Sequence, residues 1–167
     1  ESINKQFLDK HFDEKSGVLF KCDGSGMFCD TAGTPQGGDP DLNWKGYDST
    51  LYYNSYNLKS EYGWTELINL IETLNFNPSG LDSVLNVDRV LWAFAVNTVI
   101  ANFDTYNGYY VHNYYLYQTK DGLFQMIPWD LSQAFINALL GWDFGTGYPQ
   151  NYDPYYGEDP SVYRPLT

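Results

Sequence analysis

The sequence predicts an α+β fold in which 167 residues form one domain. Three observations predict it: two segments with helical spacing of apolar residues, two short apolar runs joined by an Asp-Gly turn, and a further short apolar run near residue 20. Helices and strands that do not alternate regularly are typical of this class. A hydrophobic content of 43% provides enough apolar side chains for a packed core.

The first 55 residues contain two short elements and a long loop. A polar helix is expected over residues 2–12 and a strand over residues 18–21. Residues 22–46 form a glycine-rich loop, and a loop of this length is usually functional or an insertion. Its two cysteines, Cys22 and Cys29, are either free thiols or a local disulfide of an oxidising compartment.

The central part of the chain carries the strongest periodicity. One helix is predicted from five residues at i, i+3, i+4, i+7 spacing, and residues 75–78 should end it: Trp64, Leu67, Ile68, Ile71 and Leu74. From residue 87 to residue 100 apolar side chains fall on nearly every side of the helical wheel. That pattern predicts a buried central helix, followed by a polar loop that begins at Asn102.

A β-hairpin is predicted next, with strands at residues 114–119 and 123–127. Asp121-Gly122 between two such runs is a strong hairpin signal, and Pro128 should end the second strand because proline has no N–H to donate. A helix is expected over residues 131–140, closed by Gly141. Residues 142–167 show no periodicity and are expected to be an extended surface segment.

Charge and aromatic content limit the function classes. The chain has 9 basic and 21 acidic residues, a net charge of −12, which argues against nucleic-acid binding and suits a cation site. Aromatic residues make up 19%, a share suited to packing or to ligand surfaces. No apolar run approaches the roughly 18 residues of a membrane span.

Three polar residues are predicted to meet at one end of the hairpin. Asp104 follows the central helix, Asn113 precedes the first strand, and Asp130 follows the second. Because the two strands are antiparallel, Asn113 and Asp130 should be neighbours. A loop carboxylate can take a proton from a hydroxyl, and carboxylate and amide oxygens suit Mg²⁺, so the set suits phosphoryl transfer.

Each of these residues also has a structural interpretation. Asp104 could belong to an Asx turn, Asp130 could cap the helix that follows it, and Asn113 could satisfy loop backbone groups. His112 is expected to be a structural hydrogen-bonding group and Trp129 a packing residue. The order of the three polar residues along the chain favours the functional interpretation.

These segments resemble the CotH kinase family, atypical secreted or surface kinases related to spore coat protein H. The matching motifs are Asn102-Phe-Asp104, His112-Asn113-Tyr-Tyr-Leu-Tyr117 and Pro128-Trp129-Asp130-Leu131, within a likeness that spans about residues 1–135. The resemblance implies the carboxyl-terminal-lobe part of an atypical protein-kinase-like fold. It implies that residues 1–167 are a single domain fragment, with the buried central helix before the catalytic loop and hairpin.

The resemblance also implies roles and ligands. Asp104 would be catalytic, Asp130 would bind Mg²⁺ or Mn²⁺ with support from Asn113, and ATP would donate phosphate to Ser or Thr of a secreted, surface or coat protein. Ser132 stands where the family often has a second acid or amide. The nucleotide-gripping lobe would precede Glu1, so this piece alone is expected to be inactive.

Two lysines, a second motif and two alternative functions also have to be considered. Lys21 and Lys59 are candidate phosphate-binding or structural lysines, and no residue is assigned to nucleotide binding. Asp143-Phe144-Gly145 spells the kinase metal motif, but it is expected to follow a helix instead of a hairpin strand, so Asp130 is preferred. The alternatives are a non-catalytic structural or adhesive surface module of the same fold, and a carbohydrate-binding domain.

Overall fold

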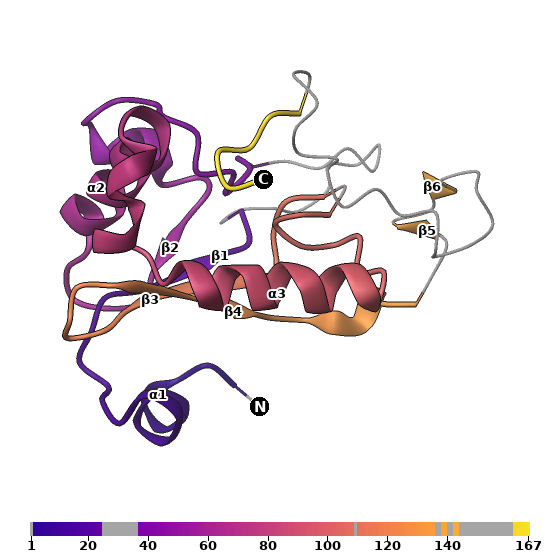
Figure 1. Ribbon diagram of the computed structural model, residues 1–167, viewed down its shortest axis with the longest axis horizontal. Helices are drawn as coiled ribbons and strands as arrows, with labels where there is room; N and C mark the ends of the chain where they lie inside the picture. Colours follow the sequence, from indigo (N-terminus) through magenta and orange to yellow (C-terminus); the bar gives the residue numbers. More distant parts are fainter. Residues whose placement is uncertain (1, 25–36, 109, 136–137, 140–141, 144–161) are drawn as a thin grey trace.

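The computed structural model describes residues 2–24, 37–108, 110–135, 138–139, 142–143 and 162–167, and its fold is α+β (Figure 1). The helices are α1 (Lys5–Phe12), α2 (Trp64–Phe76) and α3 (Val87–Val99). The strands are β1 (Leu19–Cys22), β2 (Asn57–Leu58), β3 (Tyr114–Gln118), β4 (Phe124–Pro128), β5 (Ala138–Leu139) and β6 (Trp142–Asp143). Short 3-10 helices are η1 (Ser49–Tyr52), η2 (Pro78–Ser83) and η3 (Leu131–Gln133).

A four-stranded antiparallel sheet with the strand order β2-β1-β3-β4 is the centre of the fold. The β3–β4 hairpin confirms the Asp-Gly prediction, and Gly122 has the positive φ of 88° that such a turn favours. Tyr114 pairs with Pro128, so the start of β3 and the end of β4 meet at one edge. This register positions the candidate site.

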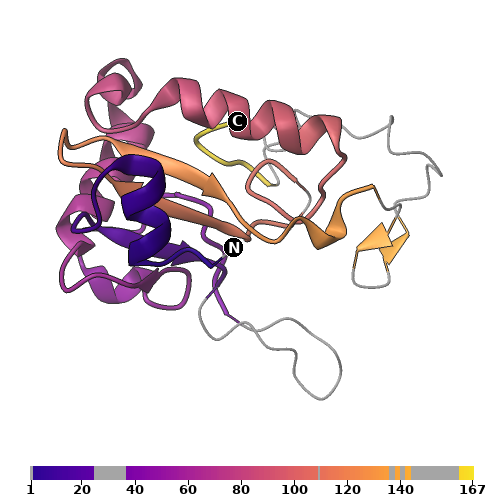
Figure 2. The same ribbon diagram turned by 90° about the horizontal axis from the view of Figure 1, so that it is seen from below.

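Both faces of the sheet are covered. On one face α1, capped by the Asn4 side chain, places Leu8 against Leu19 and Tyr117. On the other face α2 and α3 enclose the main core with the β1 and β3 side chains Phe20 and Leu116. Figures 1 and 2 show α1 and α2 on opposite sides of the strands. The helix predicted from apolar spacing at residues 64–74 is confirmed, because α2 buries its periodic face.

Helix α3 is not buried on every side, which corrects the prediction for residues 87–100. It packs against β4 and buries Val90, Ala93 and Asn97. Its opposite side is open, and Trp92 and Val99 are 66% and 81% exposed. The apolar composition predicted the helix. Which of its faces is buried depends on where the neighbouring elements lie.

The helix predicted over residues 131–140 is also wrong. Within the described residues of this segment the structure has the 3-10 turn η3 and strand β5, which pairs with β6 in a short hairpin. Ala134 is extended and Phe135 has a φ of 61°. The Phe135 N–H donates to the Ile100 carbonyl at 2.8 Å, so a contact with the end of α3 replaces an intrahelical hydrogen bond.

The chain end is not wholly a surface segment, because Arg164 is only 4% exposed. This corrects the expectation for residues 142–167 within the part that the structure describes. Among the described residues, no helix has both the length and the apolar character needed to cross a membrane.

The contrast between α2 and α3 predicts two different stability effects. Leu70 is fully buried, so Leu70→Ala is expected to lower the free energy of unfolding by about 2–5 kcal/mol. Trp92→Ser, at an exposed position, is expected to change it by less than about 0.5 kcal/mol. Urea unfolding of the purified chain measures both, and a large loss from Trp92→Ser would contradict the exposure of this face.

Candidate active site

The loop between α3 and β3 carries Asp104 in a buried position. Asp104 is 6% exposed, and its backbone N–H donates to the Asn102 side chain at 3.3 Å. Asn102 therefore makes the Asx turn that the structural interpretation assigned to Asp104. The carboxylate of Asp104 is left for interactions across the loop.

The two oxygens of the Asp104 carboxylate have different surroundings. Oδ2 accepts a hydrogen bond from the Asn113 side-chain amide at 2.8 Å. Oδ1 lies 2.8 Å from Nε2 of His112, close enough for an ion pair, yet it is buried without an aligned hydrogen bond. The His112 imidazole therefore makes an electrostatic contact with Oδ1. His112 thus faces the carboxylate, as expected of a hydrogen-bonding neighbour.

The hairpin brings Asp130 to the same end of the sheet. The Trp129 N–H donates to the Asn113 carbonyl at 2.9 Å, and Asp130 is the next residue. His112 also lies close enough to Asp130 to favour its charged form. Asn113 and Asp130 have positive φ values of 56° and 46°. Asn and Asp tolerate this region better than most residues, and such backbone strain often accompanies functional sites.

Asp130 is exposed and ionises readily. Hydrogen bonds from the hydroxyl and then the backbone N–H of Ser132 hold the pKa of its carboxyl below the usual value, with smaller help from His112 and Lys21. Its side chain also caps η3 through the Ser132 N–H at 3.2 Å. The capping interpretation is therefore true of Asp130, and Ser132 is engaged with Asp130 in the same turn.

The residues present fit a divalent cation held partly by other ligands. The Asn113 amide nitrogen is used by Asp104, which leaves its carbonyl oxygen as the acceptor that a hard cation prefers. Asp130 adds a carboxylate. In the described part of the chain no group of three or more acidic, His or Cys side chains is arranged to hold a metal ion. Mg²⁺ commonly keeps several waters and binds substrate phosphates, so one carboxylate and one amide oxygen are a sufficient protein contribution.

A family comparison identifies the kind of protein to which this chain is related. The sequence model of the CotH kinase protein family matches residues 1–161. The chain belongs to the CotH kinase family. Membership of this family indicates a kinase-like function. No curated protein sequence matches it.

Sequence reasoning missed a buried amide network between α3 and the loop that carries Asp104. The Asn97 side chain on α3 donates to the Thr105 hydroxyl at 3.2 Å and accepts from Asn102 at 3.1 Å. Asn107 donates to the Phe94 carbonyl and to the Thr98 hydroxyl. These bonds tie the loop to the helix. Asn97, near the end of the mostly apolar stretch from Val90 to Val99, was the available signal, since buried polar groups are nearly always hydrogen-bonded.

Other predicted residues have separate positions. Lys21 forms an ion pair with Asp23 at the end of β1. Cys22 is fully buried, and burial raises the pKa of its thiol well above the usual value. Cys29 lies outside the described residues, so its pairing with Cys22 stays a prediction. Asp143 lies in β6 after β5, not after a helix, and Phe144 and Gly145 are also outside the described residues.

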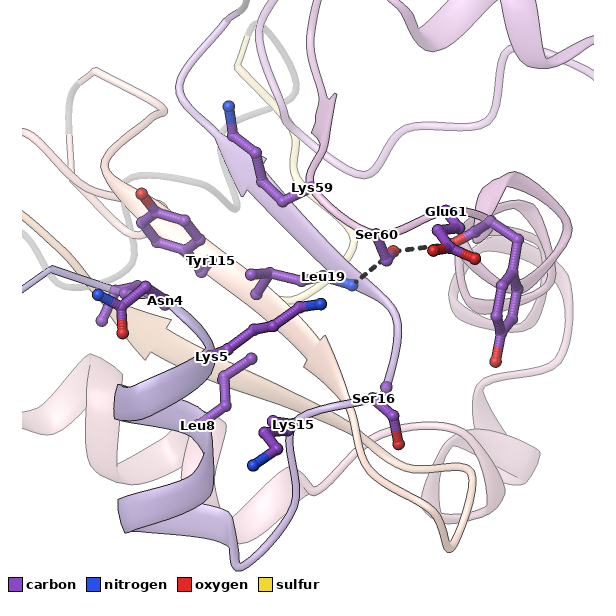
Figure 3. A pocket seen from close by; sticks show the side chains of 13 residues that line it. Asn4, Lys5, Leu8, Lys15, Ser16, Leu19, Lys59, Ser60, Glu61 and Tyr115 are labelled. Atoms are coloured by element: carbon purple, nitrogen blue, oxygen red, sulfur yellow. Dashed lines mark hydrogen bonds between the residues drawn. The ribbon is translucent and has the colours of Figure 1, made fainter.

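A cavity of about 580 Å³ lies between α1 and the β1–β2 side of the sheet (Figure 3). Its lining includes the apolar side chains of Leu19 and Tyr115 together with Lys5, Lys15 and Lys59. Within the described ranges, Lys15 pairs with Asp9 at 3.5 Å, whereas Lys5 and Lys59 have no ion pair. The Tyr115 ring also packs edge-on against Trp129 at 5.7 Å, next to Asp130.

Among the described residues, the exposed rings around Trp44 do not form the flat strip that a carbohydrate-binding surface would favour. Tyr47 and Phe76 are 69% and 63% exposed and flank Trp44. Trp44 meets them at interplanar angles of 83° and 78°, which is edge-to-face packing. Trp92 is exposed and not buried as predicted, but no ring contact joins it to this cluster among the described residues.

Proposed function

We propose that the full-length protein is a secreted or surface protein kinase that transfers the γ-phosphoryl group of ATP to Ser or Thr of extracellular or coat proteins. The observation that supports it best is the buried Asp104 carboxylate, held by Asn113 and His112 beside the hairpin end that carries Asp130. A base, an amide and a second carboxylate are the groups that such a transfer uses.

Asp104 is proposed to align the acceptor hydroxyl and take its proton. The hydroxyl oxygen forms a bond to the γ-phosphorus, the bond from that phosphorus to the ADP oxygen breaks, and the proton passes to the Asp104 carboxylate. Asn113 holds Oδ2, so the carboxylate keeps one orientation. Burial of Asp104 in a preformed loop reduces the reorganisation needed in the reaction.

Asp130 and Asn113 are proposed to hold Mg²⁺ or Mn²⁺. When bound, the metal ion neutralises charge on the phosphates. Nucleotide is proposed to bind along the sheet face that carries Tyr115. Lys5 and Lys59, which line the cavity beside Tyr115, offer positive charge in a chain whose net charge is −12, and Lys15 lines it while paired with Asp9. Their position supports phosphate or nucleotide binding despite the acidic composition.

Calorimetric titration of Mg²⁺ or Mn²⁺, with and without ATP, tests this function in the full-length protein. Asp130→Asn removes one metal-binding charge and is expected to weaken metal-dependent ATP binding at least about tenfold. Asp82→Asn removes the same charge from η2, away from the hairpin end, and is expected to bind like the wild type. Absence of binding by the folded wild-type protein would leave the non-catalytic surface module as the better interpretation.

The lowered pKa of Asp130 predicts how metal binding depends on pH. A proton competes with the metal only as the pH falls through the pKa of Asp130, which lies below the usual aspartate value. Ser132→Ala removes the hydroxyl hydrogen bond that is the main cause of the shift, so the pKa should rise toward normal. Mn²⁺ affinity of Ser132→Ala is therefore expected to begin falling at a higher pH than that of the wild type. Coincident pH profiles would contradict this role of Ser132.

A further inference from the structure

Arg164 is a buried cation that contacts the loop carrying Asp104. Its guanidinium is far from that loop in sequence, yet Nη1 donates to the Tyr106 carbonyl at 2.5 Å and to the Gly108 carbonyl. Burying a charge is costly unless the charge is paired or hydrogen-bonded. The two carbonyls meet that requirement, and Asp39 lies close enough to interact with Arg164 electrostatically.

The residues around Arg164 attach to two loops at once. The Asn43 side chain donates to the Tyr163 carbonyl at 3.1 Å. The Leu166 N–H donates to the Tyr106 hydroxyl at 3.3 Å, and that hydroxyl donates to the Asp41 carbonyl at 3.0 Å. Residues 162–167 therefore bridge the loop at residues 39–43 and the loop at residues 102–113.

We infer that Arg164 is a positioning residue of the proposed phosphotransfer site, and that residues 162–167 act as a clasp on the Asp104 loop. The clasp holds the carbonyls two and four residues after Asp104, while Asn97 holds the loop from the α3 side. Asp104 lies between these two attachments. A displacement of about 1 Å at a catalytic group can cost on the order of 10² in rate, so the clasp sets the reactive geometry. This inference rests on the proposed function.

Arg164→Lys in the full-length protein tests the clasp. Lysine keeps the charge, but its ammonium nitrogen ends one bond nearer the backbone than Nη1, the atom that donates to both carbonyls. We expect kcat for phosphotransfer to fall about tenfold or more, with the Kd values for Mn²⁺ and ATP unchanged within about twofold. Arg89→Lys is the matched control, because Arg89 is exposed and lies over the Phe12 ring.

Hydrogen exchange gives a readout that does not depend on kinase activity. The Gly108 N–H donates to Thr105 and the Tyr110 N–H donates to Phe103, both at 3.0 Å within the loop. In Arg164→Lys these two amides are expected to exchange at least about tenfold faster, while amides of α2 keep their rates. This result would support the clasp even if the wild-type protein showed no nucleotide binding, which would overturn only the proposed function.

Three outcomes would overturn the clasp. The first is an Arg164→Lys protein whose hydrogen-exchange rates and kcat equal those of the wild type. The second is an Arg164→Lys protein that loses kcat and ligand affinity equally, because that result indicates general damage. If Arg164→Lys does not fold, Asn43→Ala decides, because it removes the anchor on the Tyr163 carbonyl, together with a local hydrogen bond to the Asp41 carboxylate. Faster exchange at Gly108 in Asn43→Ala supports the clasp, and unchanged exchange overturns it.

Discussion

Replacing Asp104 by asparagine is expected to lower kcat of the full-length protein by about 10² to 10⁴. Asparagine has nearly the same shape and can still accept the Asn113 hydrogen bond, but its amide does not take a proton at neutral pH. The Kd for metal and ATP should change little, because Asp130 and Asn113 remain. Steady-state phosphotransfer assays and calorimetry on the same preparation measure the two effects.

Asp143→Asn is the matched control for this experiment. Asp143 begins the motif that resembles the kinase metal motif in sequence, but it lies in the separate β5–β6 hairpin. It is expected to keep wild-type kcat. Loss of activity in Asp143→Asn with activity retained in Asp104→Asn would reverse the assignment of the site.

Gly108→Ala is expected to destabilise the chain by about 3 kcal/mol, near the upper end of common overpacking effects. A Cβ atom at residue 108 would lie 2.2 Å from the Phe103 carbonyl oxygen and 2.5 Å from its carbon. Both are backbone atoms, so no side-chain rotation relieves the clash. Asp104 follows Phe103 directly, and we therefore expect the clash to move the loop that carries Asp104 as well.

Thermal unfolding measures this prediction, since about 3 kcal/mol corresponds to a fall in Tm of roughly 6–12 °C for a chain of this size. Gly80→Ala is the control, because its Cβ would meet the end of the Asn77 side chain, which can turn away. Its Tm should fall by no more than about 4 °C, the equivalent of about 1 kcal/mol. A Gly108→Ala protein with wild-type Tm would show that the loop backbone yields easily.

Local patterns predicted the hairpin and the neighbourhood of the candidate site. The Asp121-Gly122 turn sets the register of two adjacent strands, and that register places Asn113 beside Trp129 and Asp130. His112 and Asn113, which contact the Asp104 carboxylate, immediately precede β3 in the sequence. Their closeness to the hairpin therefore also followed from the local pattern. Their catalytic and metal-binding roles stay proposals.

Patterns failed where distant contacts compete with local preference. Residues 131–140 have helical spacing, yet the Phe135 N–H bonds to Ile100 and the chain forms a short hairpin. The apolar spacing of α3 predicted burial on all sides, yet Trp92 and Val99 are exposed. Periodicity reports how a segment could pack and does not report which neighbours reach it.

The sequence by itself determined the α+β class, the three helices α1 to α3, the hairpin and the family, because these depend on local spacing and on motifs close together in the chain. Only the tertiary structure decided that Asn97 and Arg164 support the Asp104 loop from two sides. Their partners are backbone and side-chain groups brought near by folding, and a buried polar group is stable only where the whole fold supplies its hydrogen bonds.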